Sequence, residues 1–427
     1  MKRAPKQVLR TDGVFSAFGG NVLTNIMPQT LDFTYLLDLC GFKGFTFAKT
    51  NAPLYKDEEA YSLCIEKEQV YISANTEKGV SNALKLLAVL KEKHGNAIPC
   101  MKIEDTPDIK FRAIHFCIFN PDDGTQKEDT SPKKVKERLV RAALSGYNYA
   151  FIEFWGMFPY KKHPYACWPN SPYTRTVVEE IISLAIDKLH ITPLPVQNLT
   201  SHAGWSRISS RQHVVLDQRP DLADMWVPSG WCFATENPKT QQFLRDVMDE
   251  LLEVFRNPPY FHTSCDKCFG FGSTEDDRTK PADLLFGLHI CRLNTYLQSK
   301  GCRMVMWGDM LYSSMDSLTW KPSPLLAEQL PKNILINVWT HNDIGDYWQD
   351  VDFFESLGYQ TVYSPFKNKK GIENMARLCH NKKSLGIVQT TWYCPESAME
   401  YAEYSANLQW NRNSLSSAER EIYETLF

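Results

Sequence analysis

The segment Phe111-Arg-Ala-Ile-His-Phe-Cys-Ile-Phe119 is an apolar run of strand length, and it opens the part of the chain that decides the fold. From here onward, short apolar segments alternate with stretches whose apolar residues recur at helical spacing. Strands are predicted at residues 111–119, 149–154, 192–197, 260–264, 303–307, 334–339, 361–364 and 386–391. Helices are predicted between them, including 131–143, 176–189, 240–255, 283–298 and 371–378. This alternation predicts an α/β fold, a (β/α)8 TIM barrel. A doubly wound sheet is the alternative, weakened because no glycine-rich phosphate loop follows any predicted strand.

A small α+β domain is predicted ahead of the barrel. Residues 59–65 and 69–74 have strand patterns, and the stretch that begins at Val80 has apolar residues at helical spacing. Pro99 and the polar segment 104–109 predict a linker. We therefore expect a small α+β domain at residues 1–108 and a catalytic-type barrel at residues 109–427.

Composition excludes several classes of protein. Lys and Arg number 47 and Asp and Glu number 50, so the net charge of −3 gives no basic surface for nucleic acid. No apolar run reaches the roughly 20 residues that span a bilayer. The 12 cysteines are scattered through a long chain, unlike a disulfide scaffold, and no signal-peptide core follows the basic start. These features favour a cytoplasmic protein, although a chain whose export signal had been removed would look the same. They give no indication of oligomeric state.

The residues that end or follow the predicted strands indicate a sugar site, because chemistry in a barrel collects at the carboxyl ends of its strands. They are Arg112 and His115, Glu153 and Trp155, His202 and Trp205, His262 with Asp266 and Lys267, Trp307 with Asp309, Trp339 with Asp343, Tyr363, and Trp392 with Glu396. Indole faces pack on the C–H faces of a pyranose, while charged groups bind its hydroxyls. A single tryptophan would indicate core or loop packing, but tryptophans at the ends of five strands favour a carbohydrate site.

Between about residues 58 and 400 the chain resembles the β-N-acetylhexosaminidases, family 20 of the glycoside hydrolases. Residues 58–90 are similar to the small αβ domain of that family, and Asp105-Thr-Pro-Asp-Ile-Lys-Phe-Arg112 is similar to the segment that enters its first barrel strand. Residues 195–202 and 230–240 resemble further barrel segments, and Phe261-His-Thr-Ser-Cys-Asp-Lys267 stands in place of the His-x-Gly-x-Asp-Glu signature. Residues 306–310, 364–367 and 390–392 resemble strand ends of the compact, hexosaminidase-D-like branch.

The resemblance implies an exo-acting enzyme that acts on a terminal GlcNAc or GalNAc of a glycan. It implies that the enzyme uses substrate-assisted catalysis and needs no cofactor. In this scheme Asp266 orients the 2-acetamido group of the substrate, whose oxygen attacks the anomeric carbon. Arg112 is implied to hold ring hydroxyls, Tyr363 to contact the acetamido oxygen, Trp339 and Trp392 to wall the pocket, and His202 and His262 to support the loops. Glu153, Trp307, Asp309 and Glu396 complete the predicted substrate-binding set.

The signature departs from the family at residue 267, where Lys267 replaces the glutamate that protonates the leaving oxygen. The reference pKa of lysine is about 10.4 against about 4.3 for glutamate, so an ammonium is a poor acid near neutral pH. Loss of a positioned acid typically costs about 10²–10⁴-fold in rate.

Three interpretations of Lys267 stay open. In the first, the barrel has lost hydrolytic activity and only binds sugar. In the second, another acid replaces the glutamate, with Glu153, Asp309 and Glu396 as candidates. In the third, Lys267 contacts an anionic substituent of the neighbouring sugar. The leading hypothesis is a glycoside hydrolase of the β-N-acetylhexosaminidase type, impaired or altered by Lys267. The alternative is a non-hydrolytic carbohydrate-binding protein on a hydrolase barrel.

The spacing of His262, Cys265 and Cys268 is also similar to that of metal ligands. No second close pair of ligands lies near them in the sequence, and alternate residues of a strand face opposite sides. We therefore expect no metal in this motif and no other cofactor.

Overall fold

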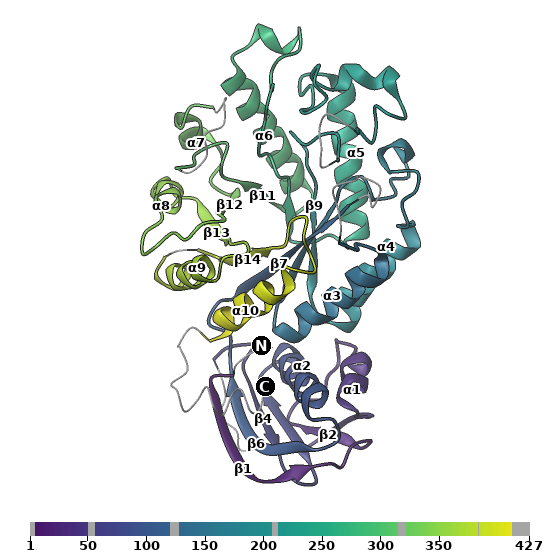
Figure 1. Cartoon of the computed structure of the whole chain (residues 1–427), viewed down its shortest axis with the longest axis vertical. Coiled ribbons are helices and arrows are strands. Elements are labelled where there is room, and N and C mark those ends of the chain that lie inside the picture. The colour runs from purple at the N-terminus through teal and green to yellow at the C-terminus, as the bar shows by residue number, and fades with distance from the viewer. Residues whose placement is uncertain are drawn as a thin grey trace.

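A mixed sheet domain and a closed barrel follow one another along the chain (Figure 1). The computed structural model describes residues 5–49, 56–119, 128–206, 212–314, 322–382 and 384–411. This architecture confirms the predicted TIM barrel preceded by a small α+β domain.

The N-terminal domain contains a six-stranded sheet in the order β1-β6-β4-β5-β2-β3. Its elements are β1 (Gln7–Phe15), β2 (Asn21–Thr24), α1 (Thr34–Cys40), β3 (Gly44–Phe47), β4 (Tyr61–Ile65), β5 (Val70–Ala74), α2 (Glu77–His94) and β6 (Ile98–Asp105). The hydroxyl of Thr76 accepts a hydrogen bond from the Lys78 N–H and caps α2, whose apolar residues join the core of the sheet. The predicted strands at 59–65 and 69–74 correspond to β4 and β5.

The sequence-based linker is partly wrong. Residues 98–105 form β6, which pairs with both β1 and β4, so Pro99 lies inside the sheet and not in a connection. The alternation of buried and exposed residues in β6 marks a strand, but the polar residues on its exposed side resemble a linker when read alone.

The barrel contains eight parallel strands, and all eight predicted strands are confirmed within two residues of their expected bounds. They are β7 (Phe111–Ile118), β8 (Tyr149–Phe154), β9 (Thr192–Val196), β10 (Tyr260–His262), β11 (Arg303–Trp307), β12 (Leu335–Trp339), β13 (Gln360–Ser364) and β14 (Gly386–Thr390). The barrel closes where β14 pairs with β7, and there a side chain on Gly386 would lie 1.9 Å from the Phe111 carbonyl oxygen. Glycine is therefore required at the closing seam.

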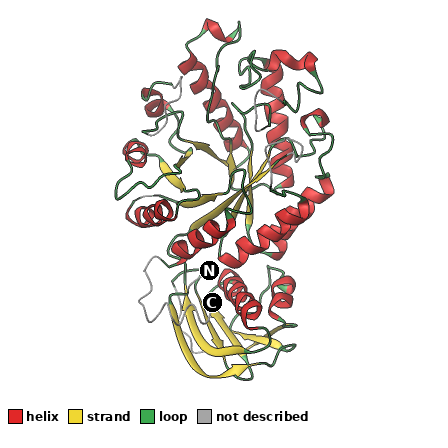
Figure 2. Ribbon diagram, viewed as in Figure 1, coloured by secondary structure: helices red, strands yellow, loops and turns green. Residues whose placement is uncertain are grey.

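Helices surround the strands of the barrel (Figure 2). They are α3 (Pro132–Ser145), α4 (Arg175–Ser183), α5 (Pro238–Val254), α6 (Ala282–Ser299), α7 (Leu325–Gln329), α8 (Gln349–Ser356), α9 (Lys369–Asn381) and α10 (Met399–Trp410). A π-helical turn, η3 (Leu184–Lys188), extends α4, and short 3₁₀ turns form η2 (Pro164–Ala166), η4 (Pro220–Met225) and η5 (Asp277–Thr279). Within the described ranges, no helix has both the length and the apolar character of a membrane span.

Alternate residues of each strand point into the barrel, and this alternation decides which side chains reach the site. One apolar cluster fills the interior; it contains Phe111, Ala113, Phe151, Leu194, Val196, Val305, Leu335, Val362 and Val388. Inward positions further along the same strands are polar or aromatic, such as Glu153 on β8 and Trp307 on β11. The inward-facing side chains therefore change from apolar to polar or aromatic toward the carboxyl ends of the strands.

The small domain packs against the barrel through α2, which lies beside α3 and near α10 (Figure 1). Trp410 of α10 and Leu144 of α3 belong to the apolar core of the small domain. The two parts of the chain therefore share buried apolar surface.

Candidate functional site

A cavity of about 340 Å³ opens at the carboxyl ends of the barrel strands. Its lining residues are Cys117, Phe119, Glu153, Trp155, Asn198, His202, Trp231, Asp266, Lys267, Phe269, Trp307, Trp339, His341, Trp392 and Tyr393. Its volume is at the lower end of the range for small-molecule sites. It combines an aromatic wall with a few ionisable groups.

Five tryptophans form much of the wall. The rings of Trp307 and Trp392 lie 5.2 Å apart and meet at 39°, while Trp155 packs 5.9 Å from Phe119. Such faces can pack on both sides of an apolar or amphipathic ring. Four of the five tryptophans noted at strand ends in the sequence belong to this wall, namely Trp155, Trp307, Trp339 and Trp392, and Trp231 is the fifth. Trp205 is buried outside the lining and donates to the Asn198 carbonyl oxygen.

Asp266 lies in the loop after β10, where His202 contacts its carboxylate at 3.5 Å. The hydroxyl of Ser201 donates to the Asp266 carbonyl oxygen and holds the loop backbone. Burial opposes ionisation of Asp266, but the positive charges of His202 and Lys267 outweigh it and hold the pKa of this carboxyl below its usual range. The cavity therefore contains an ionised carboxylate.

Lys267 is tied to the cavity wall. Its ammonium donates to Oδ2 of Asp309 at 2.9 Å and lies 4.4 Å from the centre of the Trp339 ring. The Trp339 indole N–H donates to the other carboxylate oxygen of Asp309 at 3.2 Å. Burial raises the pKa of Asp309, and Asp266 adds to this effect, whereas Lys267 and Trp339 oppose it. Asp309 lies behind Lys267 and is not among the lining residues.

Glu153 lies at the base of the cavity in a buried network. Its Oε2 accepts from His115 Nε2 at 3.1 Å and from the Cys117 thiol at 3.2 Å, and its Oε1 accepts from Asn198 at 2.7 Å. Although burial alone would raise the pKa of Glu153, the hydrogen bond and charge of His115 hold it below the usual range.

Two lining residues combine a strained backbone with an unpartnered nitrogen. His202 has φ of 48° and Trp392 has φ of 45°, both in the left-handed region that costs a non-glycine residue roughly 1–3 kcal/mol. The buried Nδ1 of His202 and Nε1 of Trp392 have no hydrogen-bond partner among the described residues. Buried polar groups are rarely left unsatisfied, so these two nitrogens are suited to bind a ligand or water.

The structure brings most of the predicted site residues together. The predicted residues that line the cavity are Glu153, His202, Asp266, Lys267, Trp307, Trp339 and Trp392. Asp309 does not line it but accepts a hydrogen bond from Lys267, which does. His262 lies beneath the wall, with its ring 4.5 Å from that of Trp307 and its Nε2 3.3 Å from Asn337. Burial lowers the pKa of His262 to about 3, so this side chain is a neutral support.

Arg112 lies away from the cavity, contrary to its predicted contact with ring hydroxyls. Its guanidinium binds both carboxylate oxygens of Glu59, at 2.6 and 3.0 Å, and packs 4.7 Å from Trp410. Arg112 stands one residue out of the inward register of β7, at the amino end of the strand, so it points toward the small domain. The buried guanidinium is therefore neutralised by a carboxylate of the protein itself.

Tyr363 and Glu396 also lie outside the cavity. Tyr363 is one residue out of the inward register of β13, and it faces Glu355 and Trp348 on the outer side of the strand. The carboxylate of Glu396 is 52% exposed and pairs with Arg138 and Arg141 of α3. The predicted contacts of Tyr363 and Glu396 with substrate therefore do not agree with their positions.

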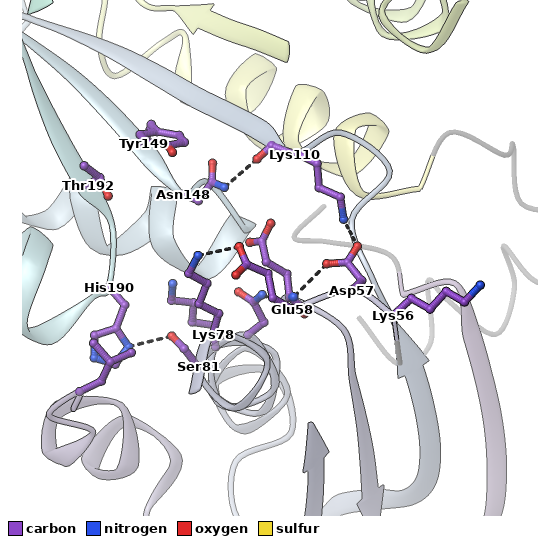
Figure 3. A pocket seen from close by; sticks show the side chains of 14 residues that line it. Lys56, Asp57, Glu58, Lys78, Ser81, Lys110, Asn148, Tyr149, His190 and Thr192 are labelled. Atoms are coloured by element: carbon purple, nitrogen blue, oxygen red, sulfur yellow. Dashed lines mark hydrogen bonds and ion pairs between the residues drawn. The ribbon is translucent and has the colours of Figure 1, made fainter. Parts of the chain in front are cut away.

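The amino ends of the strands carry a second cavity, of about 590 Å³, between the barrel and the small domain (Figure 3). Several of its charged residues are paired within the protein: Lys78 with Glu58 at 2.6 Å, and Lys110 with Asp57. His190 of the barrel lies 2.8 Å from the hydroxyl of Ser81 on α2. The Lys110–Asp57 and His190–Ser81 contacts join the two domains.

Several residues that line the cavity were not singled out as site residues in the sequence. The Trp231 ring lies 4.3 Å from the His202 ring at an angle of 55°, the His341 ring lies 5.1 Å from the Trp339 ring, and Asn198 donates to Glu153. Trp231 and His341 lie on loops outside the strands, where no periodicity marks them. Asn198 could have been found, because it continues the inward alternation of Leu194 and Val196.

The sequence motif His262-x-x-Cys265-x-x-Cys268 does not form a ligand cluster. Cys265 accepts a hydrogen bond from Thr200, and the Cys268 thiol contacts backbone carbonyls. Across the described ranges, the side chains that gather at metal-ligand spacing are those of His115, Cys117 and Glu153.

Comparisons with known proteins agree with this architecture. Residues 160–370 match the sequence model of glycosyl hydrolase family 20, catalytic domain, and residues 13–106 match that of glycosyl hydrolase family 20, domain 2. A comparison with curated proteins found no match.

Solved structures of low sequence identity share the fold. The exo-β-N-acetylglucosaminidase of Vibrio harveyi is 15% identical, with 99% of this chain and 76% of that chain covered and a TM-score of 0.72. The β-N-acetylhexosaminidase of Bacteroides fragilis is 17% identical, with 99% and 93% covered and a TM-score of 0.71. The chitobiase of Flavobacterium johnsoniae is 18% identical, with 100% and 72% covered and a TM-score of 0.70. With both domains matched in their family order, the chain belongs to glycoside hydrolase family 20.

Proposed function

We propose that the cavity binds a terminal N-acetylhexosamine of a glycan and that the protein is a β-N-acetylhexosaminidase-type hydrolase with an altered acid step. One observation carries this proposal: the carboxylate of Asp266, in the place of the family aspartate, lies in a cavity walled by five tryptophans. The Vibrio harveyi relative was solved in complex with N-acetylglucosamine, which supports this class of sugar.

Asp266 is suited to substrate-assisted catalysis. Its ionised carboxylate accepts the N–H of the 2-acetamido group and so directs the acetamido oxygen toward the anomeric carbon. As that oxygen attacks, positive charge develops on the acetamido group, and the carboxylate stabilises it within a buried site. His202 holds the carboxylate in place through the 3.5 Å contact.

The acid step is where this protein differs. The Lys267 ammonium is held by Asp309 and Trp339, and both contacts favour the charged form over release of a proton. Glu153 is ionised and bound by three donors. Glycosides whose leaving group departs without protonation are therefore the substrates expected to turn over fastest.

The fixed Lys267–Asp309 pair also favours the second candidate, a protein that binds the sugar and does not hydrolyse it. In that case the ammonium donates a hydrogen bond to a hydroxyl or to an anionic substituent of the next sugar.

Turnover of an aryl β-GlcNAc and of a natural β-linked GlcNAc disaccharide distinguishes the two candidates. Turnover of the aryl sugar alone supports Asp266-assisted hydrolysis without an acid, and turnover of both means that another group protonates the leaving oxygen. Calorimetric binding of GlcNAc-thiazoline without any turnover supports the binding protein. Absence of both turnover and binding overturns the proposal.

The variant Lys267→Glu is the companion test. A glutamate beside Asp309 and Asp266 would share a proton among three carboxylates, which suits it for general acid catalysis. Disaccharide hydrolysis is expected to rise by about 10²-fold or more. Lys300→Glu is the matched control, because it breaks a 2.8 Å pair with Asp249 at the other end of the barrel.

A further inference from the structure

We propose that His115, Cys117 and Glu153 form a zinc-binding site at the base of the cavity. The proposal concerns a metal and is independent of which sugar the cavity binds. It also adds a function to two residues, His115 and Cys117, that the substrate-assisted scheme does not use.

Two neighbouring strands place these groups together. His115 and Cys117 are successive inward positions of β7, and Cys117 is paired in register with Glu153 of β8. The three residues are 1%, 2% and 3% exposed, respectively. Their positions are therefore set by the barrel framework, and mobile loops contribute nothing to them.

The spacing of the ligand atoms matches a tetrahedral zinc site. Nε2 of His115 and Oε2 of Glu153 lie 3.1 Å apart, the Cys117 sulfur lies 3.2 Å from that oxygen, and it lies 3.6 Å from that nitrogen. Tetrahedral zinc, with bonds of about 2.0–2.1 Å to N or O and about 2.3 Å to S, separates such atoms by about 3.3–3.6 Å. An ion can therefore enter with shifts of a few tenths of an ångström.

Charge and donor type select zinc among the common metals. A thiolate and a carboxylate together cancel the double charge of Zn²⁺, so the buried site with a neutral histidine has no net charge. Magnesium and calcium prefer oxygen ligands, whereas a mixed set of sulfur, nitrogen and oxygen suits zinc. Three protein ligands and one open position are typical of catalytic zinc sites.

The surroundings orient the site toward the cavity. Asn198 donates to Oε1 of Glu153 at 2.7 Å and so directs Oε2 to His115 and Cys117. The carbonyl oxygen of Asn198 is in turn held by the Trp205 indole at 3.0 Å. Because Cys117 and Glu153 line the cavity, the fourth position faces it and would take water or a hydroxyl or carboxylate oxygen of a ligand.

Without metal the same groups bind one another through protons, and zinc binding replaces these protons. The Cys117 thiol donates to Glu153, and His115 shares a proton with it. The two states differ in whether Cys117 is a thiol or a metal-bound thiolate. Spectroscopy of a cobalt-substituted protein measures this difference directly.

The test uses the full chain after removal of metal with a chelator. Addition of Co²⁺ is expected to give one equivalent of tightly bound ion, with tetrahedral d–d bands and a thiolate-to-cobalt charge-transfer band, and added Zn²⁺ should abolish both. Cys117→Ser keeps an O–H donor to Glu153 but should remove the charge-transfer band and weaken Zn²⁺ binding by roughly 100-fold or more. Asn198→Ala should weaken binding by about 10–100-fold without removing the band.

Two buried cysteines serve as controls. Cys302→Ser, at the amino end of β11, should bind metal like the wild type. Cys268→Ser tests whether the metal is bound instead by Cys268. Loss of the charge-transfer band in this variant would assign the metal to that thiol and overturn the proposal. Persistence of the band in folded Cys117→Ser, or failure of the folded wild type to bind one equivalent, also overturns it.

Discussion

The ammonium of Lys267 and the carboxylate of Asp309 form a 2.9 Å pair at the wall of the cavity, and the indole of Trp339 contacts both partners. Lys267, which follows β10, is therefore held by an acid that follows the next strand, β11. This pair makes the cation part of the wall and shields the buried carboxylate of Asp309.

Removal of the cation should destabilise the fold. In Lys267→Met the carboxylate of Asp309, which is 3% exposed, has no counterion, and we expect a loss of about 3 kcal/mol in the free energy of unfolding. The double variant Lys267→Met/Asp309→Asn should recover much of that loss, because an amide needs no counterion. Urea unfolding of both variants measures this, and equal losses in the single and double variants would contradict it.

Arg112 should govern stability and leave sugar binding unchanged. Arg112→Lys keeps the charge but loses the two-fold contact with Glu59, so we expect a loss of about 2–3 kcal/mol and a lower Tm. The Kd for GlcNAc-thiazoline, measured by calorimetry well below that Tm, should equal that of the wild type. Weakened binding without a loss of stability would indicate that Arg112 contacts the sugar and would contradict this prediction.

The indole N–H of Trp392 should contribute to ligand affinity. Trp392→Phe keeps an aromatic face and removes a buried donor that has no partner among the described side and main chains, so affinity should fall by about tenfold with little change in Tm. Trp348→Phe is the matched control, because its Nε1 is likewise buried and unpartnered but lies beside Tyr363, outside the cavity. Equal effects of the two variants on calorimetric Kd would refute a ligand contact.

His190 should make the contact between the domains sensitive to acid. Burial lowers the pKa of His190 to about 4, below its ordinary value of 6.5, so the unfolded chain takes up the proton first as the pH falls. Its contribution to stability is therefore complete above pH 6.5 and is lost progressively down to pH 4, by up to about 3 kcal/mol.

Urea unfolding from pH 7 to pH 4 tests this. His190→Asn, chosen because asparagine tolerates the left-handed φ of 51°, should show a weaker pH dependence than the wild type. Other buried histidines, such as His213 and His289, remain in both proteins, so the difference between the two curves reports on His190. Parallel curves would show that His190 is not the group that titrates.

Local patterns account for the parts of the structure that were predicted correctly. The eight strands of the barrel and the main helices follow from apolar periodicity, which each segment carries by itself. The sheet of the small domain was predicted less completely, because β1, β2 and β3 contain few buried residues and β6 resembles a linker. Strands that depend on pairing with distant partners leave a weaker local signal.

To predict the site, one must know which residues of each strand face into the barrel as well as where each strand ends. Glu153, Trp307 and Trp339 lie on that register and reach the cavity, whereas Arg112 and Tyr363 lie one residue out of it and face the small domain and α8. A shift of one residue in a strand reverses the direction of the side chain. The sequence analysis therefore assigned Arg112 and Tyr363 to the cavity, whereas both side chains lie outside the barrel interior.

The order of strands and helices and the aromatic strand ends were determined by the sequence alone, since each is a property of neighbouring residues. The pairing of Lys267 with Asp309, the burial of Arg112 against Glu59 and the gathering of His115, Cys117 and Glu153 were decided by the tertiary structure. These contacts join residues from different strands and domains, and only closure of the barrel and docking of the small domain bring them within bonding distance.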